Sequence, residues 1–150
     1  AVDLLSSALA VIEPHATAGV HSCGDADWAT VMAAGPTLLS MPALPTLLNS
    51  VGYIQRFLDR GGWVAWGAVP TDGPVSMSAE RPWKQLCDLW CGMTQRGCDT
   101  AMLRQQSLVT PACGLALHRP VMAERLLRNT AVIAGRVRDQ AAATRFAFGA

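Results

Sequence analysis

At 150 residues the chain has the length of one ordinary domain, and its formal net charge of +1 provides no positive field that would gather nucleic acid. The hydrophobic fraction of 51% and the mean hydropathy of +0.24 lie at the upper edge for a soluble domain, while charged residues make up only 15%. No apolar run reaches the roughly 18 residues of a membrane span, so the composition argues against a membrane protein and favours elements that pack against a missing partner.

The N-terminal residues and the cysteines indicate the cellular compartment in which we expect the protein. The first residues lack the basic start, apolar core and small-residue cleavage site of a signal peptide in that order, and AVDLLSSALAVI is typical of the middle of a helix. We therefore expect the chain to begin inside a longer gene product. An odd number of cysteines without dense spacing predicts reduced thiols in a cytoplasmic protein: Cys23, Cys87, Cys91, Cys98 and Cys113.

Amphipathic stretches alternate along the chain with short apolar runs that end in Gly, Pro, Cys or Asp, a pattern typical of βα units. A first helix is expected over residues 2–12, followed by a strand over 17–21. Asp25 or Asp27 can cap the next helix. That helix is predicted over 28–34, a second strand over 37–41, and a second crossover helix over 44–60, which ends at two glycines.

The second half of the chain repeats this alternation. A continuous apolar run predicts a third strand over 63–69, and Pro82 suits the first turn of a helix over 82–95. A fourth strand is expected over 107–110 and a long final helix over 120–145, with Leu126, Thr130, Ile133 and Val137 at helical spacing.

Four successive βα units predict parallel strands joined by right-handed crossovers, hence a doubly wound sheet or part of a barrel. No GxGxxG or GxxxxGK[ST] phosphate loop follows any strand. Four units are half of eight, and the polar clusters follow the strands, where barrel enzymes build their active sites. We therefore expect an α/β fold of the (β/α)8 TIM-barrel type, with residues 1–150 forming one domain that supplies about four βα units.

Two predicted strands end next to soft metal ligands. His21 and Cys23 lie two positions apart at the end of the first strand, and Cys113 follows the fourth. A barrel brings the ends of its strands to one rim, so the three side chains can meet. One imidazole and two thiolates suit zinc better than magnesium or calcium. Each residue taken alone is more often a buried hydrophobe or a satisfied core histidine.

The segment HSCGD, followed about ninety residues later by TPACGL, resembles the HxC and PDCGL motifs of cobalamin-independent methionine synthase, in its C-terminal catalytic domain. GWVAWGAVPTDGP is similar to the family's third strand and substrate-side loop, so the resemblance spans nearly the whole chain. It implies a (β/α)8 barrel related to uroporphyrinogen decarboxylase. It also implies a zinc ion held by His21, Cys23 and Cys113 that binds the substrate thiol as thiolate.

Two positions differ from the family pattern. The family supplies a glutamate ligand from the strand after HxC, whereas Met41 or Pro42 lies near that position here, so Asp25, a water or a residue outside the chain would complete the tetrahedron. The family's loop histidine aligns near Asp72. Asp72 is therefore the candidate catalytic acid, a role that requires burial. Asp25 and His118 are candidate substrate contacts because they lie close in sequence to the ligands.

The remaining cysteines and tryptophans are interpreted as structural. Cys87 and Cys91 lie one helical turn apart with Cys98 beyond them, but without a nearby His or fourth Cys they favour core packing over a second zinc site. A core or interhelix position is likewise expected of four tryptophans: Trp63, Trp66, Trp83 and Trp90.

Three functional hypotheses follow. The first is a zinc-dependent S-methyltransferase of methionine biosynthesis that activates homocysteine or a similar thiol for methyl transfer from methyltetrahydrofolate or a methyl-corrinoid. Its partners are then a small thiol and a methyl donor, with no nucleic acid and no membrane. The second is a truncated or degenerate paralogue without turnover, which binds zinc or self-associates through the open half barrel. The third, a metal-free decarboxylase of the same superfamily, does not require this set of thiols.

Overall fold

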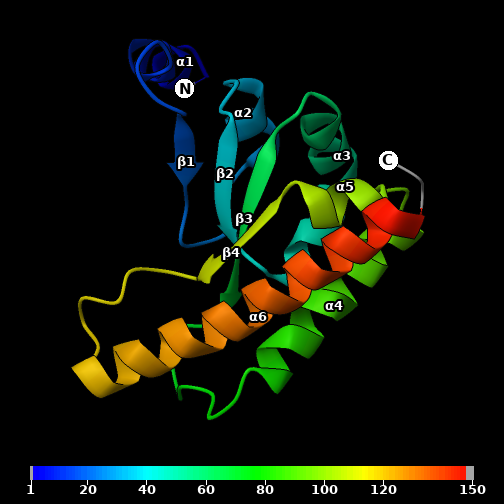
Figure 1. Cartoon of the computed structure of the whole chain (residues 1–150). Coiled ribbons are helices and arrows are strands. Elements are labelled where there is room, and N and C mark those ends of the chain that lie inside the picture. The colour runs from blue at the N-terminus through cyan, green and yellow to red at the C-terminus, as the bar shows by residue number, and fades with distance from the viewer. Residues whose placement is uncertain (1, 148–150) are drawn as a thin grey trace.

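The computed structural model describes residues 2–147 and has an α/β architecture built on a parallel four-stranded sheet (Figure 1). The strands lie across the sheet in chain order, so each crossover connects neighbouring strands. The strands are β1 (Gly19–His21), β2 (Leu38–Pro42), β3 (Trp63–Val69) and β4 (Ser107–Pro111). The helices are α1 (Val2–Ile12), α2 (Trp28–Ala33), the 3-10 helix η1 (Pro45–Asn49), α3 (Val51–Asp59), α4 (Glu80–Gln95), α5 (Thr100–Gln105) and α6 (Pro120–Ala147).

The expected α/β class with parallel strands is confirmed, and each expected strand is present within about two residues of its predicted ends. Asp27 caps α2, since its Oδ1 accepts a hydrogen bond from the Thr30 N–H at 3.2 Å. The helix expected over 44–60 was wrong as a single element. It divides into η1 and α3 at Ser50, whose φ of −110° is not helical.

The short helix α5 was missed. Its N-cap Asp99 accepts a hydrogen bond from the Met102 N–H at 2.8 Å, which satisfies one of the free donors of the first turn. With six residues it contains fewer than two turns, so it is too short to produce a recognisable hydrophobic period.

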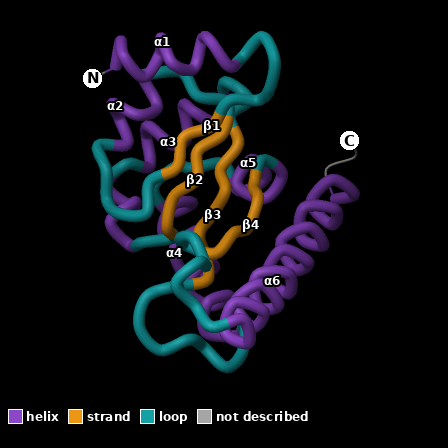
Figure 2. The backbone as a smooth tube through the Cα atoms, turned by 90° about the vertical axis from the view of Figure 1, so that its left-hand side faces the viewer, coloured by secondary structure: helices purple, strands orange, loops and turns teal. Residues whose placement is uncertain are grey.

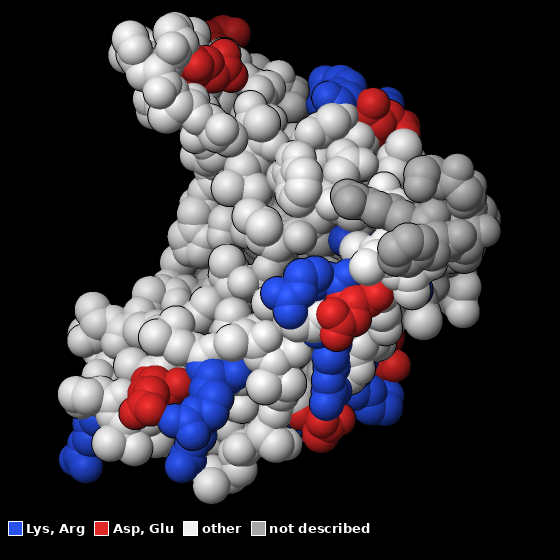
Figure 3. Space-filling view, viewed as in Figure 1, with Lys and Arg blue, Asp and Glu red and all other residues white. Residues whose placement is uncertain are grey.

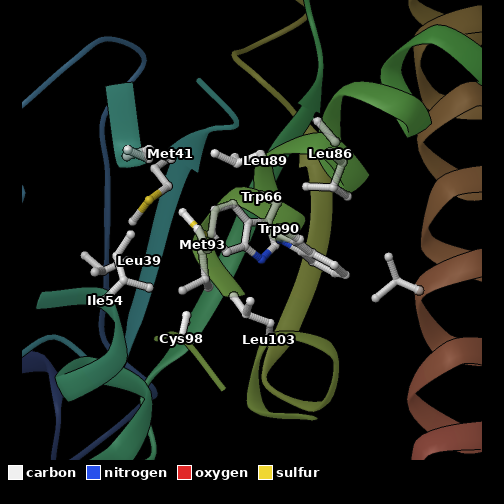
Figure 4. Packing of buried hydrophobic residues seen from close by; sticks show 14 of the residues in the cluster. Leu39, Met41, Ile54, Trp66, Leu86, Leu89, Trp90, Met93, Cys98 and Leu103 are labelled. Atoms are coloured by element: carbon white, nitrogen blue, oxygen red, sulfur yellow. The ribbon is translucent and has the colours of Figure 1, made fainter. Parts of the chain in front are cut away.

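The main core lies between the sheet and the helices that cover one of its faces. Leu39 and Met41 of β2 and Val64 and Trp66 of β3 all point to this side and are fully buried. The Trp66 ring meets the Trp90 ring of α4 edge to face, with centroids 6.0 Å apart. Figure 4 shows Leu39, Met41, Trp66 and Trp90 between β2, β3 and α4, with further residues of the same cluster around them: Ile54, Leu86, Leu89, Met93, Cys98 and Leu103.

The opposite face of the sheet has no helix over it in the described part of the chain, as Figure 2 shows. The strand register places His21, Ser40, Ala65 and Leu108 in one row across this face. Leu108 is 46% exposed, and Trp63 is 40% exposed at the start of β3. The core position expected of Trp63 was therefore wrong, because the face toward which it points is uncovered.

The cysteines outside the first and fourth units differ in burial. Cys98 is 3% exposed and belongs to the core, as expected, whereas Cys91 is exposed and Cys87 is half-buried. The core position expected of Cys91 was wrong, because this side of α4 faces solvent. Burial raises the pKa of the Cys98 thiol to about 11, so this thiol stays protonated and inert.

Charged side chains of both signs alternate along α6 (Figure 3), while the surface that lies between α1 and α6 in the same view carries none. Some of these charges pair, for example Arg128 with Glu124 of the same helix at 2.6 Å and Arg136 with Glu80 of α4. Within residues 2–147, none of the helices has the length and apolar composition needed to cross a membrane.

Candidate metal centre

The first two ligand candidates are positioned by the end of β1. His21 is the last residue of the strand, and one further ladder bond follows it, from the Ser22 N–H to the Ser40 carbonyl at 3.1 Å. Cys23 then leaves the sheet at the start of the loop that leads to α2. Because residues two apart along an extended chain point to the same side, the imidazole and the thiol lie together.

Cys113 reaches the same place from the other edge of the sheet. Since β1 and β4 are three strands apart, a flat sheet would hold their ends about 14 Å apart at the usual strand spacing. The chain after β4 instead crosses over the end of β3, where the Ala112 N–H bonds the Val69 carbonyl at 2.9 Å. Gly67 makes the crossing possible, because a Cβ there would lie 2.7 Å from the Cα of Ala112. A register shift between Gly67 and Val69 accompanies it.

The three candidate atoms form one cluster. His21 Nε2 lies 3.1 Å from Cys23 Sγ, and Cys23 Sγ lies 2.9 Å from Cys113 Sγ. All three lie within 4.8 Å of one another. The convergence predicted from the strand ends is therefore present, and the site is open to solvent, since His21 and Cys23 are exposed and Cys113 is half-buried.

The donor set can close on a metal with small side-chain movements. Sulfur ligands of a tetrahedral zinc, each about 2.3 Å from the metal, are separated by about 3.8 Å. The two sulfurs here lie 2.9 Å apart, so they would move apart by about 1 Å or less on binding. One nitrogen and two sulfurs would leave a fourth position free for water or a substrate atom, the arrangement found at catalytic zinc sites.

Ser40 orients the imidazole, and sequence reasoning missed it. Its Oγ lies 2.8 Å from His21 Nδ1, and the two residues are register partners in neighbouring strands. When Nδ1 carries the proton and donates it to Ser40, the lone pair of Nε2 is free for a metal. The alignment of the first two predicted strands would have placed Ser40 beside His21, but a serine within an apolar strand gives no signal by itself.

The pKa of the Cys23 thiol is raised above its usual value. The largest cause is its hydrogen bond with Cys113, followed by desolvation and by negative charge on Cys113 and Asp72. Negative charge beside Cys23 disfavours its thiolate, and a metal ion bound at this position would favour it.

The other predicted site residues lie outside this cluster. Among the described residues, Asp25 and His118 do not belong to the group of potential ligands, and neither lines the cavity beside Cys23. Asp72 does line that cavity, but it is exposed and so lacks the burial that a role as acid requires. Met41 and Pro42 are buried, and neither carries a carboxylate. Among the described residues, no fourth His, Cys, Asp or Glu joins the three.

A cavity of about 510 Å³ opens beside Cys23. It lies between the end of β2 with η1, the loop after β3, and α4, and most of its lining is apolar. This size and composition suit a small organic molecule. The cavity and the cluster of potential ligands share Cys23, so a molecule bound there would reach the sulfur.

Comparison with known proteins gives no independent assignment: no protein-family profile, curated protein sequence or solved structure matches this chain.

Proposed function

We propose that His21, Cys23 and Cys113 bind a zinc ion and that the chain is a zinc-dependent S-methyltransferase. The thiol acceptor is homocysteine or a similar compound, and the methyl donor is methyltetrahydrofolate or a methyl-corrinoid. One observation carries the proposal: a nitrogen and two sulfurs from opposite edges of the sheet lie within 4.8 Å of one another beside a cavity. A soft donor set of this kind favours zinc.

The proposed reaction divides into tasks for the chain's own residues. Cys23, Cys113 and His21 provide three donors, and Ser40 holds the His21 ring so that Nε2 faces the sulfurs. Zinc, when bound, supplies the positive charge that lets an acceptor thiol lose its proton near neutral pH. The acceptor thiolate attacks the methyl carbon, a carbon–sulfur bond forms as the bond between methyl group and donor breaks, and the donor keeps the electron pair of that bond.

We further propose that the four βα units correspond to half of a (β/α)8 barrel. The chain-order parallel sheet, the helices on one face and the cluster of ligands after the strand ends support this fold. The approach of the ends of β1 and β4 supports a curved sheet over a flat one. All five cysteines are free thiols, which supports a reducing compartment such as the cytoplasm.

Metal analysis of protein purified without chelator tests the zinc site. We expect about one zinc per chain and its loss in His21→Ala, Cys23→Ser and Cys113→Ser, since each variant removes one of only three protein donors. Cys91→Ser is the matched control, because Cys91 is also an exposed thiol but lies on α4. Absence of stoichiometric zinc from the unmodified chain, persisting after refolding with zinc, would remove the basis of the proposal.

Zinc-edge X-ray absorption with and without homocysteine then separates thiol activation from a structural ion. We expect two zinc–sulfur bonds in the protein alone and a third after homocysteine is added, because the open position accepts the substrate sulfur. An unchanged sulfur count would show that the ion does not activate this thiol.

A non-catalytic half barrel is the second candidate. It is favoured by the exposure of Asp72, which lacks the burial that a catalytic acid requires, and by the open sheet face that exposes Trp63 and Leu108. Such a face predicts self-association through apolar surface. Gel filtration tests it: a dimer with zinc but no added sulfur bond in the presence of thiols supports this candidate, and a monodisperse monomer contradicts the self-association.

A further inference from the structure

The cavity beside Cys23 has an asymmetric composition. Cys23 marks one side of it, and the body is lined by apolar side chains of the β2 end, η1 and α4: Pro42, Leu44, Pro45, Leu48 and Leu89. If a bound thiol points its sulfur toward Cys23, the methylene groups of its aliphatic chain would contact these apolar side chains. Their burial would add to binding at about 0.8 kcal/mol per methylene group.

The charged groups of this cavity are of one sign. Asp72 and Asp88 line it, whereas no Lys, Arg or His is found among the described residues of the lining. Asp88 is paired with Lys84 at 2.5 Å and is therefore largely neutralised. Asp72 makes no ion pair within residues 2–147 and is the unpaired carboxylate of the cavity.

Asp72 also lies near the ligand cluster. Asp72 and Cys23 line the same cavity, so a molecule that contacts the sulfur of Cys23 also lies close to the carboxylate. Arg81 lines a second cavity of about 440 Å³ that shares Asp72, but Arg81 does not line the first. A molecule in the cavity beside Cys23 therefore meets a carboxylate without a compensating cation.

We infer that the cavity beside Cys23 holds the body of the acceptor thiol and that Asp72 selects acceptors by charge, favouring cationic and uncharged aliphatic thiols over anionic ones. The inference rests on the proposed function and deepens it, because it specifies the class of acceptor. Asp72 attracts an ammonium group and repels a carboxylate or sulfonate. Because Asp72 is exposed, its effect is that of a surface charge, on the order of fivefold in affinity for each comparison.

Thiols derived from homocysteine provide a matched series for the test. Removal of the carboxylate gives 3-aminopropanethiol, removal of the ammonium group gives 4-mercaptobutanoate, and 1-propanethiol carries neither. Each is titrated into the full-length chain loaded with cobalt in place of zinc, and binding is followed by the near-ultraviolet absorption from sulfur to cobalt. We expect the aminothiol to bind most tightly, propanethiol next and mercaptobutanoate most weakly. Equal affinities, or the reverse order, would overturn the inference.

The variant Asp72→Asn tests whether Asp72 causes this preference for cationic over anionic thiols. The thiols also differ in intrinsic acidity. This difference is the same for the unmodified chain and for Asp72→Asn, so it cancels when the affinity ratios of the two proteins are compared. We expect the ratio of aminothiol to mercaptobutanoate affinity to fall on the order of 25-fold in Asp72→Asn, because the fivefold attraction of the ammonium group and the fivefold repulsion of the carboxylate multiply. Glu13→Gln, an exposed carboxylate that does not line the cavity, should leave the ratio unchanged. An equal fall in both variants, or none in Asp72→Asn, contradicts the assignment.

The two proposals fail in different ways. If cobalt binds but no thiol adds a sulfur bond, the methyl-transfer proposal fails and the selectivity with it. If all the thiols add a sulfur bond with equal affinity, the metal centre and thiol activation stand and only the role of Asp72 is refuted.

Discussion

Cys23 Sγ lies 2.9 Å from Cys113 Sγ, although the two residues are 90 positions apart and follow strands at opposite edges of the sheet. The loop after β4 has to cross the end of β3 for this to occur, and it does so over Gly67. The cluster of ligands therefore depends on the path of this loop, so a test of one is also a test of the other.

Mild oxidation of the metal-free chain should join Cys23 and Cys113. A disulfide has an S–S length of about 2.05 Å, so the sulfurs need to approach by about 0.9 Å. Diamide takes up the two electrons and two protons that the thiols lose. We expect titratable thiols to fall from five to three, since one disulfide consumes two of the five cysteines. Peptide mapping identifies the linked pair.

Two variants and one ligand control this experiment. Cys91→Ser should still lose two thiols to diamide, whereas Cys113→Ser should lose none, because it leaves Cys23 without a partner. Bound zinc should slow the oxidation by holding both sulfurs as ligands. If mapping links Cys23 to another cysteine, the path of the loop after β4 differs from the one described.

Removal of the Ser40 hydroxyl should weaken metal binding without abolishing it. Ser40→Ala leaves all three ligands but frees the His21 ring, whose Nδ1 lies 2.8 Å from the Ser40 Oγ. Loss of such an outer partner lowers metal affinity by about 10-fold to 100-fold. Competition with a chromogenic zinc chelator measures the change.

The conservative variant distinguishes orientation from general damage to β2. Ser40→Thr retains a hydroxyl and a residue that favours strands, so it should recover most of the affinity. Ser22→Ala is the matched control, because the Ser22 hydroxyl bonds the Gly24 carbonyl at 3.3 Å and not the imidazole. Equal loss in all three variants would contradict a specific role for Ser40.

Gly67→Ala should damage the metal centre from a distance. The added Cβ would lie 2.7 Å from the Cα of Ala112 and 3.1 Å from the carbonyl oxygen of Met41, so the backbone before Cys113 has to move. We expect a loss of about 1–3 kcal/mol in stability together with weaker zinc binding. Gly52→Ala, where a Cβ meets nothing within 4 Å on α3, should be neutral or slightly stabilising. Unchanged zinc affinity in Gly67→Ala would show that the loop is not held by this contact.

The sequence was sufficient to predict the ligand cluster but not what supports it. His21, Cys23 and Cys113 follow predicted strands, and parallel strands end at the same edge, so their convergence follows from topology. Ser40 contributes because the strand register places it beside His21, and Gly67 contributes because the loop after β4 passes over it. Neither the register of one strand against another nor the crossing over β3 is encoded in the local pattern of residues.

The errors in burial have the same origin. The preference of their residue types predicts core positions for Trp63 and Cys91, yet Trp63 lies on the open face of the sheet and Cys91 on the solvent side of α4. Residue type gives the tendency to be buried, whereas only the packing of β3 and α4 decides which face is covered. The same argument applies to the (β/α)8 barrel, which stays a prediction.

Leu86 and Leu117 provide a direct test of the core. Leu86 of α4 is 0% exposed within the main cluster, whereas Leu117 in the loop before α6 is 100% exposed. Leu86→Ala should cost about 2–5 kcal/mol of unfolding free energy, because a cavity remains where the side chain was. Leu117→Ala should change it by less than about 0.5 kcal/mol. Urea denaturation measures both, and similar values for the two variants would contradict the position of α4 against the sheet.

The ion pair between Glu80 and Arg136 connects α4 to α6 and should make this contact sensitive to acid. The Arg136 Nη1 donates a hydrogen bond to the Glu80 Oε2 at 3.2 Å, a second bond joins Nη2 to Oε1, and the Arg136 guanidinium lies over the Trp83 ring. The hydrogen bond from Arg136 is the main cause that lowers the pKa of Glu80 below its usual 4.5. A carboxyl group whose pKa is lower in the folded state adds stability above its unfolded pKa.

That stability begins to fall as the pH drops below 4.5 and is lost once the pH passes below the folded pKa of Glu80. The melting temperature of the unmodified chain should therefore exceed that of Glu80→Gln near neutral pH, and the difference should disappear in acid. Added salt of about 1 M should reduce the difference at neutral pH, because both side chains are accessible to solvent. A difference that stays constant between pH 7 and about pH 3 would mean that packing of α6 on Trp83, and not the charge of Glu80, fastens the two helices.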